Sequence, residues 1–348
     1  MRVVVVGASG NVGTALLRRL VDDGSITSVV GVARRVPRST PPAPYDVATW
    51  VACDVAAPSA VDTLTTAFAG ADAVVHLAWA IQPSHDRRRL HDVNVAGTRW
   101  VLDAARRAGV PHVVVASSIG AYAPAPDDVP RGEGWATAGV RSSSYSVDKV
   151  AVERVLDEIE EAHPELTIAR IRSALVFQRA AGHEISRYFL GPWVPKRALA
   201  GHLPVLPWPE GLRLQVVHAQ DVAEAFREAV VRRVRGPFNL AAPEVLRGQD
   251  FADILANGRM RTVPVAQARA AVAVGWHARV VPVGPGWLDM ALSAPLLDTS
   301  RAERELGWRP AWSGIEAARD LIAGIAAGAG TASPPMRPRR RDPGILDA

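Results

Sequence analysis

A tyrosine and a lysine four residues apart, Tyr145 and Lys149 in Tyr145-Ser-Val-Asp-Lys149, are the residues whose spacing points most clearly to chemistry. On a helix, this spacing places both side chains on one face, which continues through Val152 and Leu156 toward the protein body. A phenol with a pKa of about 10 is a poor acid or base at neutral pH, but a fixed ammonium nearby stabilises the phenolate. The pair therefore predicts proton transfer by Tyr145 with help from Lys149.

A serine pair, Ser117 and Ser118, follows the apolar run 112–116, which is typical of a buried strand. Doubly wound sheets bind ligands at the carboxyl ends of their strands. A hydroxyl at this edge can donate to a substrate carbonyl and stabilise oxyanion character. The serines gain significance from their combination with the tyrosine and the lysine.

A glycine-rich loop lies between the apolar run 2–6 and the helical pattern 11–22. Glycines permit a tight turn and close approach to a pyrophosphate, and the free N–H groups of a helix N-terminus face its negative charge. The predicted dinucleotide-binding residues of this loop are Gly7, Ser9, Gly10, Asn11, Val12 and Gly13.

The residues that follow the second and third predicted strands bear on the choice of dinucleotide. Residues 24–45 contain no Asp or Glu to hold a ribose diol, but they contain Arg34 and Arg35. A guanidinium suits a 2′-phosphate, so the sequence favours NADP, with NAD as the alternative. Asp54, just after the third strand, is placed to accept from the adenine amino group.

The elements that must position these residues alternate strand and helix through residues 1–172, which predicts an α/β fold with a Rossmann-type doubly wound parallel sheet. Residues 173–330 are rich in proline and glycine. We expect them to form mainly a smaller, irregular C-terminal substrate-binding lobe, with some segments returning to the first domain. Residues 265–292 give no firm prediction, and residues 331–348 are expected to be a disordered basic tail.

Composition excludes several classes of protein. The 348 residues are 48% hydrophobic and 22% charged, and the net charge of +5 is too small for a nucleic-acid footprint. One cysteine, Cys53, and histidines without ligand spacing predict no metal. No apolar run approaches the ~18 residues of a membrane helix, and the N-terminal run lacks the length of a signal peptide, so we expect a cytoplasmic protein. Neither a Gly-x-Ser-x-Gly elbow nor a Walker lysine occurs, which argues against a hydrolase or kinase.

Taken together, the motifs resemble the extended short-chain dehydrogenase/reductase family, also called NAD-dependent epimerase/dehydratases. The matching segments are Gly7-x-x-Gly10-x-x-Gly13, Asp54-Val55, His76-Leu77-Ala78, Asn94-x-x-Gly97-Thr98, Ser117 to Tyr122, the Tyr145/Lys149 pair, His218 to Ala223, and Asp298 to Pro310. The resemblance implies that Val55, Leu77 and Ala78 contact the cofactor. It also implies that Ser118 is the catalytic serine, that Lys149 binds the nicotinamide ribose, and that helices near residues 88–108 and 145–161 form a homodimer.

Departures from the family pattern bear on the substrate. Ser118-Ile-Gly lacks the acidic residues of sugar-nucleotide dehydratases, and Leu214 stands where epimerases usually carry a diphosphate-binding arginine. We therefore expect an NADP-favouring oxidoreductase that acts on a small carbonyl or alcohol, with Ser118, Tyr122 and Tyr145 at the substrate. A nucleotide-sugar epimerase with recycled NAD and a non-catalytic NADP-binding regulator are the alternatives.

Overall fold

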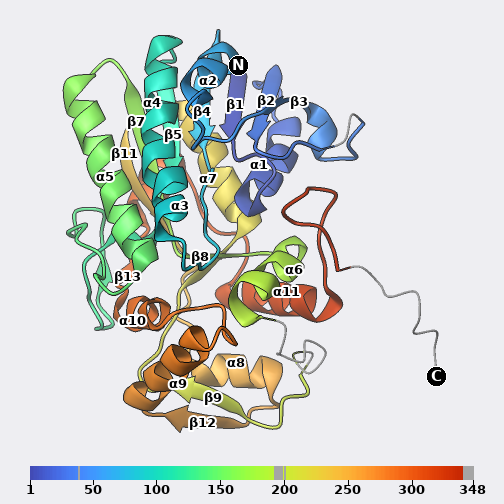
Figure 1. The fold of residues 1–348 in the computed structure, drawn as a ribbon, viewed down its shortest axis with the longest axis vertical. Coiled ribbons are helices and arrows are strands. Elements are labelled where there is room, and N and C mark those ends of the chain that lie inside the picture. The colour runs from blue at the N-terminus through green and yellow to red at the C-terminus, as the bar shows by residue number, and fades with distance from the viewer. Residues whose placement is uncertain (38–39, 192–198, 200, 340–348) are drawn as a thin grey trace.

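A seven-stranded parallel sheet forms the centre of the computed structural model, which describes residues 1–37, 40–191, 199 and 201–339 (Figure 1). The strand order β11-β7-β5-β4-β1-β2-β3 confirms the predicted α/β class with a doubly wound sheet. The strands are β1 (Arg2–Val6), β2 (Ser28–Ala33), β3 (Ala48–Ala52), β4 (Ala73–His76), β5 (His112–Ala116), β7 (Thr167–Ser173) and β11 (Gly236–Leu240).

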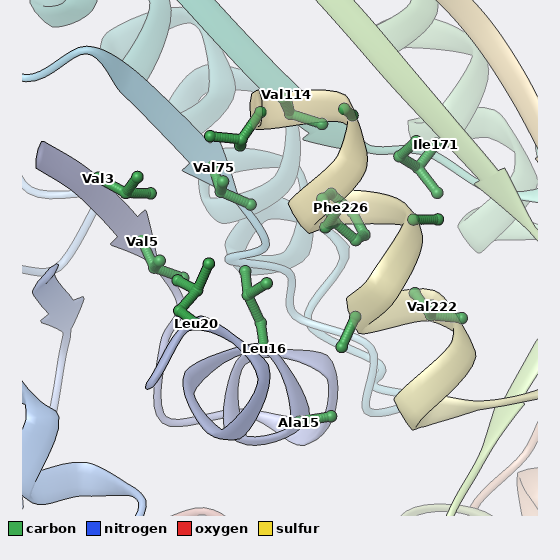
Figure 2. Packing of buried hydrophobic residues seen from close by; sticks show 14 of the residues in the cluster. Val3, Val5, Ala15, Leu16, Leu20, Val75, Val114, Ile171, Val222 and Phe226 are labelled. Carbon is green, nitrogen blue, oxygen red and sulfur yellow. The ribbon is translucent and has the colours of Figure 1, made fainter. Parts of the chain in front are cut away.

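Alternating side chains of β1 face the two layers of helices. Val3 and Val5 pack toward α1 and α7, while Val4 and Val6 pack into the core on the other face. All four valines are at most 1% exposed, which explains why the strand is a continuous apolar run. Figure 2 shows the first of these cores, where Val3 and Val5 lie with Leu16, Leu20, Val222 and Phe226.

Helices cover both faces of the sheet. The face opposite α1 and α7 carries the helices on which Tyr145 and its neighbours lie. The helices of this domain are α1 (Asn11–Val21), α2 (Ala60–Phe68), α3 (Arg87–His91), α4 (Gly97–Arg107), α5 (Ser144–Ala162) and α7 (Ala219–Arg232). A π-helical segment, η2 (Asp92–Ala96), joins α3 and α4. The single helix expected near residues 88–108 is therefore a continuous helical stretch made of α3, η2 and α4.

The second half of the chain builds a smaller lobe below the carboxyl ends of the strands (Figure 1). It also supplies β11 and α7 to the main domain, and α7 packs beside α1. The lobe and its connections contain β8 (Leu175–Phe177), α6 (Gly182–Ile185), η5 (Ser186–Leu190), β9 (Leu206–Pro209), β10 (Val216–His218), α8 (Gly248–Leu255), β12 (Met260–Val263), α9 (Val265–His277), α10 (Pro285–Ser293) and α11 (Gly314–Ala327), and the short strands β6 (Pro130–Arg131) and β13 (Leu296–Leu297) pair beside them. Residues 265–292, which the sequence did not place, form α9 and most of α10.

The C-terminal segment differs from the expectation of a disordered tail. Residues 331–339 pack against the main domain, with Ser333 and Met336 fully buried. Composition suggested disorder because apolar residues are few, but one buried methionine and several backbone hydrogen bonds hold the segment in place. Residues 340–348 lie outside the described part of the chain. No helix in the described part is long and apolar enough to span a membrane.

Candidate active site

The glycine-rich loop connects β1 to α1 at the carboxyl edge of the sheet. Gly7 has a φ of +92°, and a Cβ there would lie 2.6 Å from the Ala78 backbone nitrogen, so only glycine fits. A Cβ on Gly13 would lie 2.5 Å from the Gly7 oxygen. Gly10 caps α1 without a side-chain acceptor, and the first turn contains no acidic residue. The N–H groups at this helix N-terminus therefore suit an anionic group such as a pyrophosphate.

A cleft of about 820 Å³, open to solvent, runs along this loop. The predicted cofactor residues that line it are Gly7, Ser9, Gly10, Arg34, Arg35, Asp54, Val55, Leu77 and Ala78. Five other predicted cofactor residues are not among the lining residues: Asn11, Val12, Gly13, Tyr145 and Lys149. The Asn11 side chain instead donates to the Val176 oxygen at 3.3 Å.

The far end of the cleft collects charged groups. Arg34 and Arg35 lie at the end of β2, and Asp54 lies at the end of β3. Burial raises the pKa of Asp54, but a 2.6 Å hydrogen bond from Arg89 and the Arg89 charge outweigh this, so its pKa lies below the usual value. The Asp54 carboxylate thus already has a cationic partner on α3, which competes with an adenine amino group for it.

The three predicted catalytic residues lie together beside this cleft. Ser118 follows β5, and its Oγ accepts from the Gly120 N–H at 3.0 Å. Tyr145 and Lys149 project from the first turns of α5, which begins after the capping residue Ser143. Lys149 Nζ donates to the Ala116 oxygen at 2.9 Å, at the end of the same strand that carries Ser118. A Cβ on Gly120 would lie 2.9 Å from the Tyr145 ring, so a glycine there makes room for the tyrosine.

Aromatic rings surround this group. The Trp79 ring lies 3.5 Å from Lys149 Nζ and meets the Tyr145 ring edge-on at 5.7 Å. Trp287 of α10 lies on another side, with its ring centroid 5.0 Å from that of Tyr145. Trp79 also lines the cleft, and its buried Nε1 has no hydrogen-bond partner among the residues described. Trp79 therefore contacts both the cleft and the Tyr145/Lys149 pair.

Burial dominates the titration of the catalytic pair. It raises the pKa of Tyr145 to about 12, although a hydrogen bond with Ser118 lowers it. It lowers the pKa of Lys149 to about 7, against the opposing charges of Glu153 and Asp148. The ammonium lies 5.8 Å from the centroid of the Tyr145 ring and is directed toward Trp79. The expected lowering of the Tyr145 pKa by Lys149 is therefore absent from this arrangement.

Tyr122 is buried and hydrogen-bonded to other parts of the chain. Tyr122 is 2% exposed, and its hydroxyl donates to Asn239 Oδ1 at 2.6 Å and accepts from Arg172 at 3.0 Å. Arg172 also binds the buried carboxylate of Glu153, to which Ser117 donates at 2.5 Å. The prediction that Tyr122 lines the substrate pocket stays a prediction, and in this structure its hydroxyl is part of a buried polar network next to the end of β5.

The cleft also has lining residues that sequence reasoning missed. Glu184 of α6, Tyr188 of η5 and Pro335 of the C-terminal segment form a wall facing the glycine-rich loop. They come from irregular segments without a family motif, so no sequence signal identified them. Burial raises the pKa of Glu184 to about 7, despite the Arg187 charge and a hydrogen bond with Tyr188.

A pH dependence follows from Glu184. An anionic dinucleotide favours the protonated carboxyl, so the cofactor affinity should fall as pH rises above about 7, by up to about tenfold per pH unit. Glu184→Gln should remove this part of the slope. Lys149, whose pKa is also about 7, contributes equally to the pH dependence of cofactor affinity in the wild type and in Glu184→Gln. Calorimetric titration of both proteins across neutral pH measures the difference, and identical pH profiles would rule out a role for Glu184.

Known proteins resemble the chain over most of its length. The sequence profile of the NAD dependent epimerase/dehydratase family matches residues 3–241. An uncharacterized protein of Mycobacterium tuberculosis is 30% identical over 328 residues, which cover 93% of this chain but only 30% of that protein. The UDP-glucose 4-epimerase of Neisseria meningitidis serogroup C is 26% identical over 257 residues, covering 68% of this chain and 70% of that protein.

Solved structures share the fold. The UDP-glucose 4-epimerase of Thermus thermophilus, in complex with NAD, superposes on this chain with a TM-score of 0.68 at 20% sequence identity. The match covers 93% of this chain and 99% of the epimerase chain. The chain belongs to the NAD dependent epimerase/dehydratase family.

Proposed function

We propose that this chain is an NAD-dependent enzyme that inverts a carbon of a nucleotide sugar by transient oxidation at Ser118, Tyr145 and Lys149. The observation that carries the proposal is the convergence of these three residues beside the cleft along the glycine-rich loop. The similarity to a named UDP-glucose 4-epimerase supports the substrate class. This reading takes the place of the small-carbonyl reaction that the sequence favoured.

The residues of the chain divide the work as follows. When bound, a nicotinamide supplies the hydride acceptor and then the donor, so that an alcohol becomes a carbonyl and is reduced again. Tyr145 takes the alcohol proton and later returns it, while Ser118 donates to the developing carbonyl oxygen. Lys149 stabilises the phenolate once its ammonium faces Tyr145. Trp79 lines the cleft and contacts the Tyr145 ring, so its indole is placed to contact a substrate that reaches Tyr145.

A second candidate is the oxidation or reduction of a small carbonyl or alcohol. Arg213, next to the position where epimerases carry a diphosphate-binding arginine, is 5% exposed and donates to Asp128 and to the backbone oxygens of Ala125 and Ala294. Leu214 itself pairs with Leu246 in the lobe. The rings of Trp79 and Trp287 further favour an apolar substrate.

Product analysis separates the two candidates. The protein is incubated with UDP-glucose or UDP-galactose without added cofactor, and in parallel with a panel of small carbonyls and NADH or NADPH. Conversion of one sugar nucleotide into the other, with no net cofactor consumption, supports the epimerase. Steady consumption of added cofactor by a carbonyl, with no sugar conversion, supports the second candidate.

The choice between NAD and NADP is tested at the end of β2. Arg34→Ala should weaken NADPH by about 1.5 to 3 kcal/mol, the range for a hydrogen bond to a charged group, and leave NADH nearly unchanged if Arg34 holds a 2′-phosphate. Arg88→Ala, an exposed arginine on α3 outside the lining residues, is the matched control. Calorimetry with both cofactors measures the effect. Equal losses for NADPH and NADH would contradict a role in 2′-phosphate recognition.

The homodimer implied by the family resemblance stays a prediction. Trp100 of α4 and Val147 of α5 are 41% and 46% exposed, on the two helices expected to pair. These apolar side chains support the proposal that α4 and α5 form the contact between two copies.

A further inference from the structure

The segment from Thr331 to Arg339, here called the clasp, has a defined shape. The Thr331 N–H donates to the Met336 oxygen at 2.7 Å, and the Arg339 N–H donates to the Gly328 oxygen at 2.9 Å. A Cβ on Gly330 would lie 2.3 Å from the Met336 oxygen, so the turn closes over a glycine. The first bond closes the clasp on itself, and the second ties Arg339 to Gly328 at the end of α11. Figure 1 shows the clasp rising from α11 toward α1.

The clasp is fastened to the glycine-rich loop and to α1. The buried Ser333 hydroxyl donates to the backbone oxygen of Ser9. The Met336 side chain is fully buried, and its sulfur lies 3.4 Å from the Thr14 hydroxyl. The Thr331 hydroxyl lies 2.6 Å from that of Tyr45. Three anchors therefore join the clasp to the domain that holds the cofactor cleft.

On its other side, the clasp meets the C-terminal lobe. The Arg187 side chain of η5 donates to the Pro335 oxygen at 2.7 Å. Pro335 lines the cleft together with Glu184 and Tyr188. The clasp therefore spans from the loop to η5 along one side of the cleft.

We propose that the clasp is part of the dinucleotide site: Pro335 contacts the bound cofactor, Ser333 positions the glycine-rich loop through Ser9, and the cofactor leaves only when the clasp detaches. Detachment of the clasp breaks its anchoring hydrogen bonds and exposes Met336 to water. Because both changes cost free energy, the attached clasp slows the release of the cofactor. A slowly released cofactor is what a reaction that recycles it within each turnover requires. The inference rests on the dinucleotide site of the proposed function and is independent of the substrate.

The test measures the rate at which bound NADH is displaced by excess NAD, followed by nicotinamide fluorescence. Ser333→Ala should accelerate dissociation by about 3- to 10-fold, as expected for one lost hydrogen bond, and truncation after Gly330 by at least about tenfold. Arg337→Gln, an exposed side chain of the same segment, should leave the rate unchanged.

Thermal unfolding without cofactor distinguishes a purely structural role of the clasp from a role in retaining the cofactor. Lower melting temperatures for Ser333→Ala or the truncated chain, with dissociation rates equal to the wild type, would overturn the proposal. If the truncated chain does not fold, Ser333→Ala decides the question alone. Because displacement needs no substrate, a faster release supports the clasp even where no sugar nucleotide is converted, so the two proposals fail separately.

Discussion

Tyr145→Phe should lower kcat by at least about 100-fold, because general acid-base groups contribute roughly 10²- to 10⁴-fold. The change removes one hydroxyl, which lies within hydrogen-bond reach of Ser118 and which we propose exchanges a proton with a substrate oxygen. The ring contacts with Trp79 and Trp287 do not involve the hydroxyl, so the fold and the cofactor affinity should be nearly unchanged. Steady-state kinetics and calorimetry measure both effects.

Tyr122→Phe is the matched control for this prediction. It also removes one buried hydroxyl, but one that bonds Asn239 and Arg172 and belongs to a residue that does not line the cleft. It should lower the melting temperature and leave kcat within a few-fold, because a buried partner loses its hydrogen bond. If Tyr145→Phe retained more than about a tenth of the wild-type kcat, the proton would come from another group and the assigned role would be wrong.

Lys149→Met should impair both turnover and cofactor binding. The ammonium is expected to stabilise the Tyr145 phenolate and to donate to the nicotinamide ribose, so kcat should fall by roughly 10²- to 10⁴-fold. The cofactor affinity should weaken by about 1.5 to 3 kcal/mol if a charged hydrogen bond is lost. In the present arrangement Lys149 donates to Ala116 and lies over Trp79, so the effect depends on its turning toward the site.

The two variants should differ in which kinetic and binding constants they change. Tyr145→Phe changes kcat alone, whereas Lys149→Met changes kcat and the dissociation constant together. A Lys149→Met protein that binds cofactor as tightly as the wild type would show that the ammonium does not contact the cofactor. Circular dichroism of each variant checks that the fold is retained.

Much of the main domain could be predicted because its signals are local. The valines of β1 alternate between two cores, and the glycines of the loop are required by close contacts, so periodicity and spacing identify both. Tyr145 and Lys149 share a helix, and their common orientation follows from helical geometry.

The remaining parts of the site depend on contacts between residues that are distant in the sequence. Tyr122 follows Ser118 closely, but its partner Asn239 lies on β11, and no local pattern predicts that pairing. Trp287 reaches Tyr145 from α10, and Met336 is buried by packing against α1. Low apolar content suggested disorder for the clasp, and only the tertiary structure shows the surface that receives it.

The central claim is that a hydride leaves one substrate carbon and returns to the same carbon within one turnover, while Tyr145 transfers the proton. The most direct measurement uses UDP-galactose carrying deuterium at the carbon that is inverted, with protein loaded with NAD and no free cofactor. The proposal expects UDP-glucose that retains the deuterium at that carbon, with no net change in nicotinamide absorbance. Loss of the deuterium to water, or no conversion of the UDP-galactose, would contradict it.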